Sequence, residues 1–117
     1  MTPRYVMKRA TDGSYFWNLI AGNGETILTS ERYAAKGTAL NGIDSAKANS
    51  PYDVRYDRRT SSRGEPYFVL KGSNGEVIGN SEMYSSTTAR EGGINAVKVA
   101  GPIGGLDDRT ASPLGVR

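Results

Sequence analysis

The stretch YFWNLIAGNGETILTSERY, from Tyr15 to Tyr33, decides the fold. It contains two runs of alternating apolar residues joined by Asn23-Gly24. Asn-Gly between such runs is a strong β-hairpin signal, because both residues tolerate the positive φ of a type I′ turn. The sequence therefore predicts two strands here, over 15–21 and 25–29.

The same pattern returns 51 residues later, so the chain is an internal duplication. Residues 4–51 align with residues 55–102 without a gap, and 15 of the 48 positions are identical. The first copy contributes Asn23, Gly24, Glu25, Ser30, Glu31, Tyr33, Gly42 and Ile43 to the repeated set, and the second contributes Asn74, Gly75, Glu76, Ser81, Glu82, Tyr84, Gly93 and Ile94. We interpret these residues as structural, because recurrence within one chain marks what the folding unit itself needs.

Each copy also predicts a strand before the hairpin and a helix after it. The early strands are expected around Tyr5 and over 54–59. Apolar residues then recur at helical spacing, and the two helices are expected to stop at Pro51 and Pro102. In the second copy Ser85, Ser86 and Thr88 are candidate N-caps, and Thr88 with Glu91 fits a capping box.

A unit of about 50 residues is marginally stable alone, so the two copies are expected to share one core. We predict an α+β fold: tandem β(3)-α-β repeats that form one antiparallel sheet, with two helices on one face and a pseudo-two-fold axis. Residues 1–107 would form this single domain, and residues 108–117 a flexible tail. Residues 103–107 are a possible closing strand, which the repeats could exchange, although Gly104-Gly105 interrupts it.

At these residues the chain resembles the YegP-like family, small bacterial domains of unknown function that occur singly or in tandem. The resemblance covers about residues 4–107 and rests on Asn-Gly-Glu, Ser-Glu-x-Tyr and Gly-Ile-x-x-x-Lys, each present twice. It implies one sheet built from tandem repeats whose last strands are exchanged. It supplies no catalytic residues.

The composition disfavours an enzyme. The chain has no His and no Cys, which removes the usual general base, thiolate chemistry and the commonest metal ligands. We expect no cofactor and no metal site, and an enzyme without His or Cys chemistry is the weakest alternative. No stretch is long and apolar enough for a membrane span, and the N-terminus lacks a signal-peptide pattern, so a cytoplasmic location is expected.

The sheet face away from the helices is the candidate binding surface. Alternation in the central strands places aromatic, polar and basic side chains there together: Phe16, Asn18, Tyr67, Val69 and Lys71, with Lys8 and Arg59 beside them by strand pairing. We interpret the chain as a non-enzymatic binding module, a monomer with an internal pseudo-dimer, whose partner is a protein or a second copy. The alternatives are single-stranded nucleic acid, which fits aromatics among cations and the net charge of +3, and an ordinary solvated face.

Overall fold

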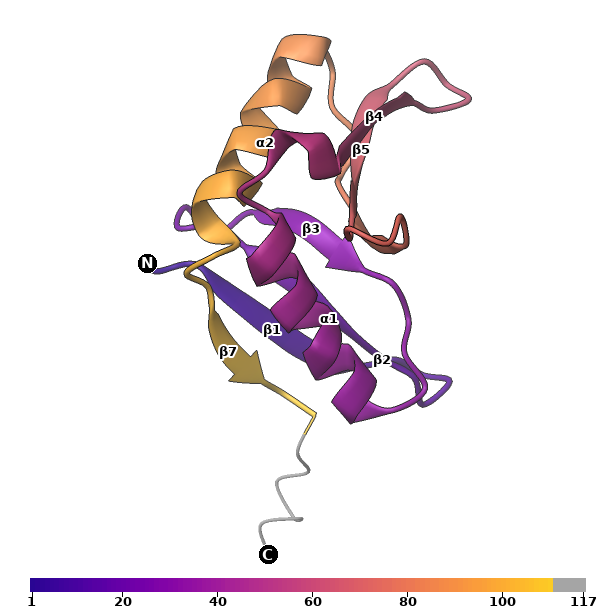
Figure 1. The fold of residues 1–117 in the computed structure, drawn as a ribbon, viewed down its shortest axis with the longest axis vertical. Helices are drawn as coiled ribbons and strands as arrows, with labels where there is room; N and C mark the ends of the chain where they lie inside the picture. The colour runs from indigo at the N-terminus through magenta and orange to yellow at the C-terminus, as the bar shows by residue number, and fades with distance from the viewer. Residues whose placement is uncertain (111–117) are drawn as a thin grey trace, which may run out of the picture.

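The computed structural model describes residues 1–110. Seven strands form one sheet, and two α-helices lie on one side of it, in front in Figure 1. The elements are β1 (Arg4–Arg9), β2 (Tyr15–Ile20), β3 (Thr26–Ser30), α1 (Lys36–Asn49), the short 3-10 helix η1 (Asp53–Arg55), β4 (Tyr56–Thr60), β5 (Pro66–Lys71), β6 (Val77–Asn80), α2 (Thr87–Ala100) and β7 (Gly105–Asp108). The predicted α+β fold of two fused repeats is confirmed.

An approximate two-fold axis passes through the middle of the sheet. The strand order is β4-β5-β6-β3-β2-β1-β7, so β3 and β6 meet at the centre. They pair antiparallel with Thr29 opposite Asn80, which occupy the same position in the two repeats. Equivalent residues facing each other are what a two-fold axis between the strands requires.

The repeats exchange the strands that follow their helices. β4 follows α1 but pairs with β5 of the second repeat, whose first strand it is in the 51-residue alignment, and β7 follows α2 but pairs with β1 of the first. The β1–β7 pairing is parallel, so the sheet is mixed and the expectation of a wholly antiparallel sheet was wrong on this point. The crossover through α2 returns the chain in the same direction as β1, whereas each hairpin reverses it.

The closing strand forms at residues 105–108, with Gly104 just before it. A Cβ on Gly104 would lie 2.8 Å from Cε2 of the buried Tyr5 ring, so the glycine lets the chain pass over that ring. After the strand, the backbone N–H of Arg109 donates to the Met7 carbonyl at 2.9 Å. The expected tail over 108–117 thus begins inside β7, and its residues 111–117 lie outside the described part of the chain.

The core lies between the sheet and the helices. Trp17, Leu19, Phe68 and Leu70 point to the helix side and are fully buried, as the alternation predicts. The helices pack on them through small and branched residues: Ala39, Ile43 and Ala46 on α1, and Ile94, Val97 and Ala100 on α2. Among residues 1–110, neither α-helix has the length and apolar character needed to cross a bilayer.

Two buried tyrosines join each repeat to the helix of the other. The Tyr5 hydroxyl donates to the Gly101 carbonyl at the end of α2 at 2.8 Å. The Tyr56 hydroxyl donates to the Ser50 carbonyl at the end of α1 at 2.6 Å. Each helix end, whose carbonyls lack intrahelical partners, is therefore satisfied from the opposite half.

Two local predictions were wrong. Asn23 does not adopt positive φ; only Gly24 does, at 87°, and the Gly24 N–H donates to the Ala21 carbonyl, so this is a longer loop than a two-residue type I′ turn. The capping box on α2 is also absent. Ser86 is the N-cap, its Oγ accepting from the Ala89 N–H at 3.0 Å, and this places Glu91 beyond the first turn.

Candidate binding surfaces

Several residues shared by the repeats are used by the fold itself. The Oγ of Ser30 accepts from the Trp17 N–H at 2.9 Å and donates to the carbonyl of the next residue at 2.7 Å. Ser81 makes the same two bonds, with the Phe68 N–H at 2.9 Å and the next carbonyl at 2.8 Å. Each hydroxyl thus links the two strands of its own hairpin at the end where the chain leaves for the helix.

The helical glycines mark the closest approach of the strand-to-helix loops. A Cβ on Gly42 would collide with the Tyr33 hydroxyl, and a Cβ on Gly93 with the Tyr84 hydroxyl. In each helix the glycine therefore leaves room chiefly for a tyrosine ring. In the hairpins the side chain of Asn23, like that of Asn74, accepts from the backbone N–H two residues later at 3.0 Å.

The four repeated glutamates are exposed, and none takes part in an ion pair within residues 1–110: Glu25, Glu31, Glu76 and Glu82. The pairing of β3 with β6 brings them together across repeats. Burial raises the pKa of Tyr84, and the charges of Glu82 and Glu25 raise it further, so these two carboxylates lie near one hydroxyl. Glu31 and Glu76 line one cleft together.

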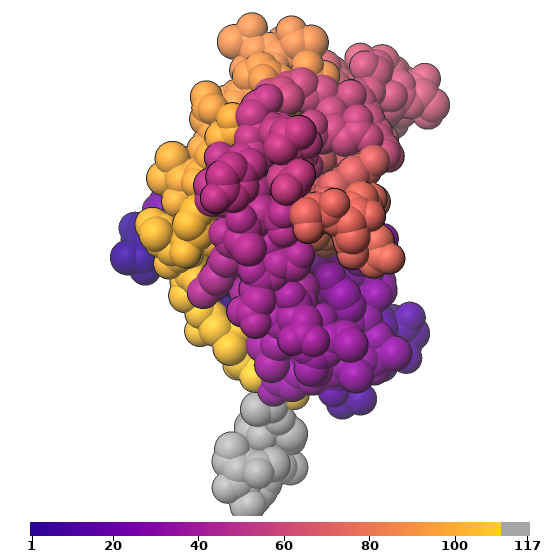
Figure 2. Space-filling model, in the orientation of Figure 1, coloured from indigo at the N-terminus to yellow at the C-terminus, as the bar shows by residue number. Residues whose placement is uncertain are grey.

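That second pairing belongs to a polar cleft on the helix side, which we call the α1 cleft. It has a volume of about 380 Å³ and lies between α1 and the β5–β6 hairpin. Figure 2 shows this hairpin, in salmon, beside α1. Its polar lining residues are Glu31, Tyr33, Thr38, Asn41, Ser45, Asn74 and Glu76. Alternation in the strands gave no sign of this cleft; the polar residues at i, i+3 and i+7 on α1 are the signal that could have revealed it.

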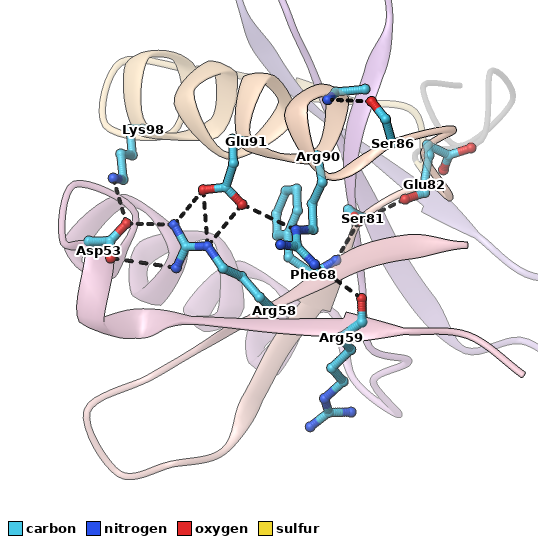
Figure 3. Close-up of polar contacts among 11 residues, drawn as sticks. Asp53, Arg58, Arg59, Phe68, Ser81, Glu82, Ser86, Arg90, Glu91 and Lys98 are labelled. Atoms are coloured by element: carbon cyan, nitrogen blue, oxygen red, sulfur yellow. Dashed lines mark hydrogen bonds and ion pairs between the residues drawn. The ribbon is translucent and has the colours of Figure 1, made fainter. Parts of the chain in front are cut away.

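An ion network links the edge strand β4 to α2 (Figure 3). The Arg58 guanidinium binds both Glu91 oxygens at 2.8–3.0 Å and Asp53 at 2.9 Å. Lys98 also reaches Asp53, at 2.9 Å. Hydrogen bonds from Arg58 and then Lys98 lower the pKa of Asp53 to about 2. The charges in this network are therefore matched within the protein.

The surface predicted from strand alternation lies on the sheet face away from the helices, which we call the open face. Register places Lys8 opposite Phe16 on β1 and β2, and Arg59 opposite Tyr67 on β4 and β5. A row of paired residues crosses the same face between them: Asp107, Val6, Asn18, Thr29, Asn80, Val69 and Asp57. The seven predicted surface residues therefore share one face of the sheet.

Not all of these residues are available for contact. Asn18 and Val69 are buried, 8% and 1% exposed, and the Asn18 amide donates to Thr29 Oγ1 at 2.8 Å. Phe16 and Tyr67 are half-buried and present part of each ring. Asn18 and Val69 thus form the floor of the open face. The residues that a partner could contact are the aromatic ones at its two ends, Phe16 and Tyr67.

Most cations on the open face already have partners. Asp57, which sequence reasoning missed, binds Arg59 at 2.8 Å and Lys71 at 3.3 Å. Hydrogen bonds from these two cations, Arg59 first, lower the pKa of Asp57. Arg4 lies 3.5 Å from Asp107. Much of the positive charge is therefore neutralised locally.

The aromatic residues are flanked by cations at both ends of the open face. The Arg32 guanidinium lies 4.7 Å from the centre of the Phe16 ring, a cation–π distance. At the other end, Tyr67 is adjacent to Arg59 through strand pairing. Among residues 1–110 no group of three or more His, Cys, Asp or Glu side chains is arranged to hold a metal ion.

Comparison with known proteins gives the same repeat structure. The family model described as Domain of unknown function (DUF1508) matches twice, over residues 10–57 and 61–108. The first match starts after β1 and ends two residues into β4, and the second starts after β4 and ends with β7, so each covers two strands, a helix and the beginning or whole of the strand that follows.

The relatives match over most of this chain and most of their own length. The UPF0339 protein YegP of Yersinia pestis is 52% identical over 93 residues, 80% of this chain and 83% of its own. A UPF0339 protein of Pseudomonas aeruginosa is 44% identical over 94% of this chain and all of its own. The solution structure of Escherichia coli yegP, a protein of unknown function, has a TM-score of 0.90 at 43% identity, covering 96% of this chain and 97% of that one. This chain therefore belongs to the DUF1508 family of YegP-like proteins.

Proposed function

We propose that this protein is a protein-binding module that acts through its open face. One observation carries the proposal: both helices cover the same side of the sheet, and the other side presents Phe16 and Tyr67 with cations beside them. Aromatic residues surrounded by polar and charged groups are enriched in protein interfaces. The buried row between them provides a rigid floor.

The charge distribution favours a protein partner over single-stranded nucleic acid. Nucleic-acid grooves offer cations to phosphates, and their binding weakens steeply with salt. Here Arg59 and Lys71 share Asp57, and Arg4 lies against Asp107. A phosphate would have to displace these carboxylates, whereas a protein interface tolerates a rim of matched ion pairs.

The test replaces the two rings together. Phe16→Ala with Tyr67→Ala should weaken partner binding by at least about tenfold, because buried aromatic anchors dominate interface energies. A photo-crosslinking amino acid at position 16 or 67 identifies the partner in cells of the host. The control is Tyr52→Ala, since Tyr52 is 57% exposed and lies in the loop between α1 and β4.

Four outcomes separate the possibilities. Loss of capture in the double variant, with circular dichroism and Tyr52→Ala unchanged, supports the proposal. Cross-linking to a second copy of the chain would make the partner the protein itself. Undiminished capture by the double variant would refute the proposal. Oligonucleotide binding that disappears with salt, with no protein captured, would also refute it.

A further inference from the structure

The two repeats carry equivalent clefts with opposite chemistry. Each cleft lies between the helix of one repeat and the hairpin of the other. The α1 cleft is lined by Asn41, Ser45, Gly72 and Asn74, and the residues at the equivalent positions, Gly92, Ala96, Ala21 and Asn23, line a cleft beside α2. These four shared positions relate the two clefts by the duplication, so the differences between their linings are informative.

The differences remove hydrogen-bonding groups from one helix only. On α1, Thr38, Asn41 and Ser45 fall at i, i+3 and i+7, which places them on one face of the helix. The equivalent residues of α2 are Ala89, Gly92 and Ala96, and none has a polar side chain. From α2 only Asn95 brings a polar side chain to that cleft, which is bordered by exposed Val99 and Ile103.

The α1 cleft contains negative charge without a partner. Glu31 comes from the end of β3, and Glu76 comes from the β5–β6 hairpin. None of the ion pairs within residues 1–110 includes either carboxylate, and no Lys or Arg lines the cleft. The protein carries a net charge of +3, so this acidic site runs against its overall balance.

One unpaired polar group lies beneath Gly42, behind the cleft lining. The Nε1 of Trp17 is fully buried and has no hydrogen-bond partner in the described part of the chain. It lies below Gly42, whose added Cβ would come within 3.3 Å of it, and Gly42 lines the cleft. This N–H is a donor, so only water or another acceptor could satisfy it, and the groups of the cleft that can receive a cation are its carboxylates and side-chain oxygens.

We propose that the α1 cleft binds an aliphatic ammonium or guanidinium group. Glu31 and Glu76 would accept charge-assisted hydrogen bonds from the cation. The side-chain oxygens of Thr38, Asn41 and Ser45 accept further bonds, and Val77 and Ile78 contact the aliphatic stem. The cleft volume of about 380 Å³ suits one such chain. The group has two sources: a lysine or arginine side chain of a partner protein, or a free polyamine.

The experiment is an amide NMR titration with three small probes: N-acetyl-lysine methylamide, spermidine and the uncharged N-acetyl-norleucine methylamide. The cationic probes should shift the amides of Asn41, Gly42, Ser45 and Asn74, and the norleucine compound should not. Stronger binding by the lysine compound indicates a partner side chain, and stronger binding by spermidine indicates a free polyamine. No shift in the cleft with either cation would overturn the proposal.

Matched variants test the site. Glu31→Gln with Glu76→Gln should weaken binding of the better cation by about tenfold or more, since two charge-assisted bonds are lost. Both residues are exposed and unpaired, so the fold should be unaffected. The control is Glu25→Gln with Glu82→Gln, the same change at the equivalent positions, which should leave the affinity unchanged. Equal weakening by both pairs, or by neither, would refute the assignment.

This site is independent of the open face. The α1 cleft lies on the helix side of the sheet, so Phe16→Ala with Tyr67→Ala should leave cation binding intact. Loss of cation binding in that variant would show that the shifts do not come from the cleft.

Discussion

At the residue scale, two adjacent glycines of α2 have different surroundings. A Cβ on Gly93 would collide with the Tyr84 ring, which stacks on Phe68 at 6.3 Å between centres. A Cβ on Gly92 would meet nothing within 4 Å. Substitution of Gly93 therefore tests the packing against Tyr84, and substitution of Gly92 tests only the cost of glycine in a helix.

We predict that Gly93→Ala lowers the free energy of unfolding by ~1–3 kcal/mol, because the buried ring has to move. Gly92→Ala should instead raise it by up to ~1 kcal/mol, through better helix propensity and a less flexible unfolded chain. Urea unfolding of both variants measures the difference. Equal effects would mean that the Tyr84 contact does not constrain the helix.

The pKa of the Asp53 carboxylate should depend on the two cations bound to it, Arg58 and Lys98. Its pKa is about 2 in the folded protein against an ordinary 3.8, so its favourable interactions are complete above pH 3.8 and are lost as the pH falls through about 2. Arg58→Gln should move the pKa of Asp53 upward toward 3.8, and Lys98→Gln should move it less. Carbon-13 carboxyl shifts followed against pH measure this.

Asp108 provides the internal control for that titration. Its pKa is also about 2, but Lys36 and Thr110 lower it, and it lies on β7 at the other edge of the sheet. Arg58→Gln should leave it unchanged. A parallel rise in both aspartates would indicate general loosening instead of a broken pair.

At the scale of elements, the two helices begin differently. Ser86 caps α2 through its side chain, whereas Ala35 precedes α1 and offers no side-chain acceptor. We predict that Ser86→Ala lowers the free energy of unfolding by about 1 kcal/mol, since an orphan N–H loses its acceptor. Ser85→Ala, one residue earlier, should change it by less than ~0.5 kcal/mol. Chemical denaturation of both variants checks this.

The elements themselves could be predicted from sequence because their patterns are local. Alternation in residues 15–29 and its copy identified four strands, and the repeat identified two helices. Details that depend on neighbours could not be predicted: Glu91 looked like part of a capping box, but Arg58, distant in sequence, binds it. The parallel β1–β7 pairing was missed for the same reason.

The candidate sites divide in the same way. Strand alternation placed Phe16 and Tyr67 on one face, since side-chain direction follows from the period of two. It could not show that Val69 is covered or that Asp57 neutralises two cations, because both depend on packing across strands. The α1 cleft joins Glu31 to Glu76 through the pairing of β3 with β6, which no single repeat encodes.

At the scale of the molecule, the two repeats share a fold but differ in the residues of their first strands, β1 and β4. Met7 is fully buried in the first repeat, beside β1's partner β7. The equivalent residue of the second repeat is Arg58, on β4, whose outer edge pairs with no strand among residues 1–110. An inward-pointing charge on an edge strand discourages pairing with other chains. The uncovered edge is thus protected by the Arg58–Glu91 network.

The exchange of β7 has a mechanical consequence. The first and last strands along the chain, β1 and β7, lie side by side and run in the same direction, with Gly105 opposite Arg4 and Asp108 opposite Met7. Pulling on the two termini therefore slides these strands past each other, and the hydrogen bonds between them bear the force together instead of opening one after another. The protein should therefore withstand a high force and then unfold in one step, although its two ends belong to different repeats.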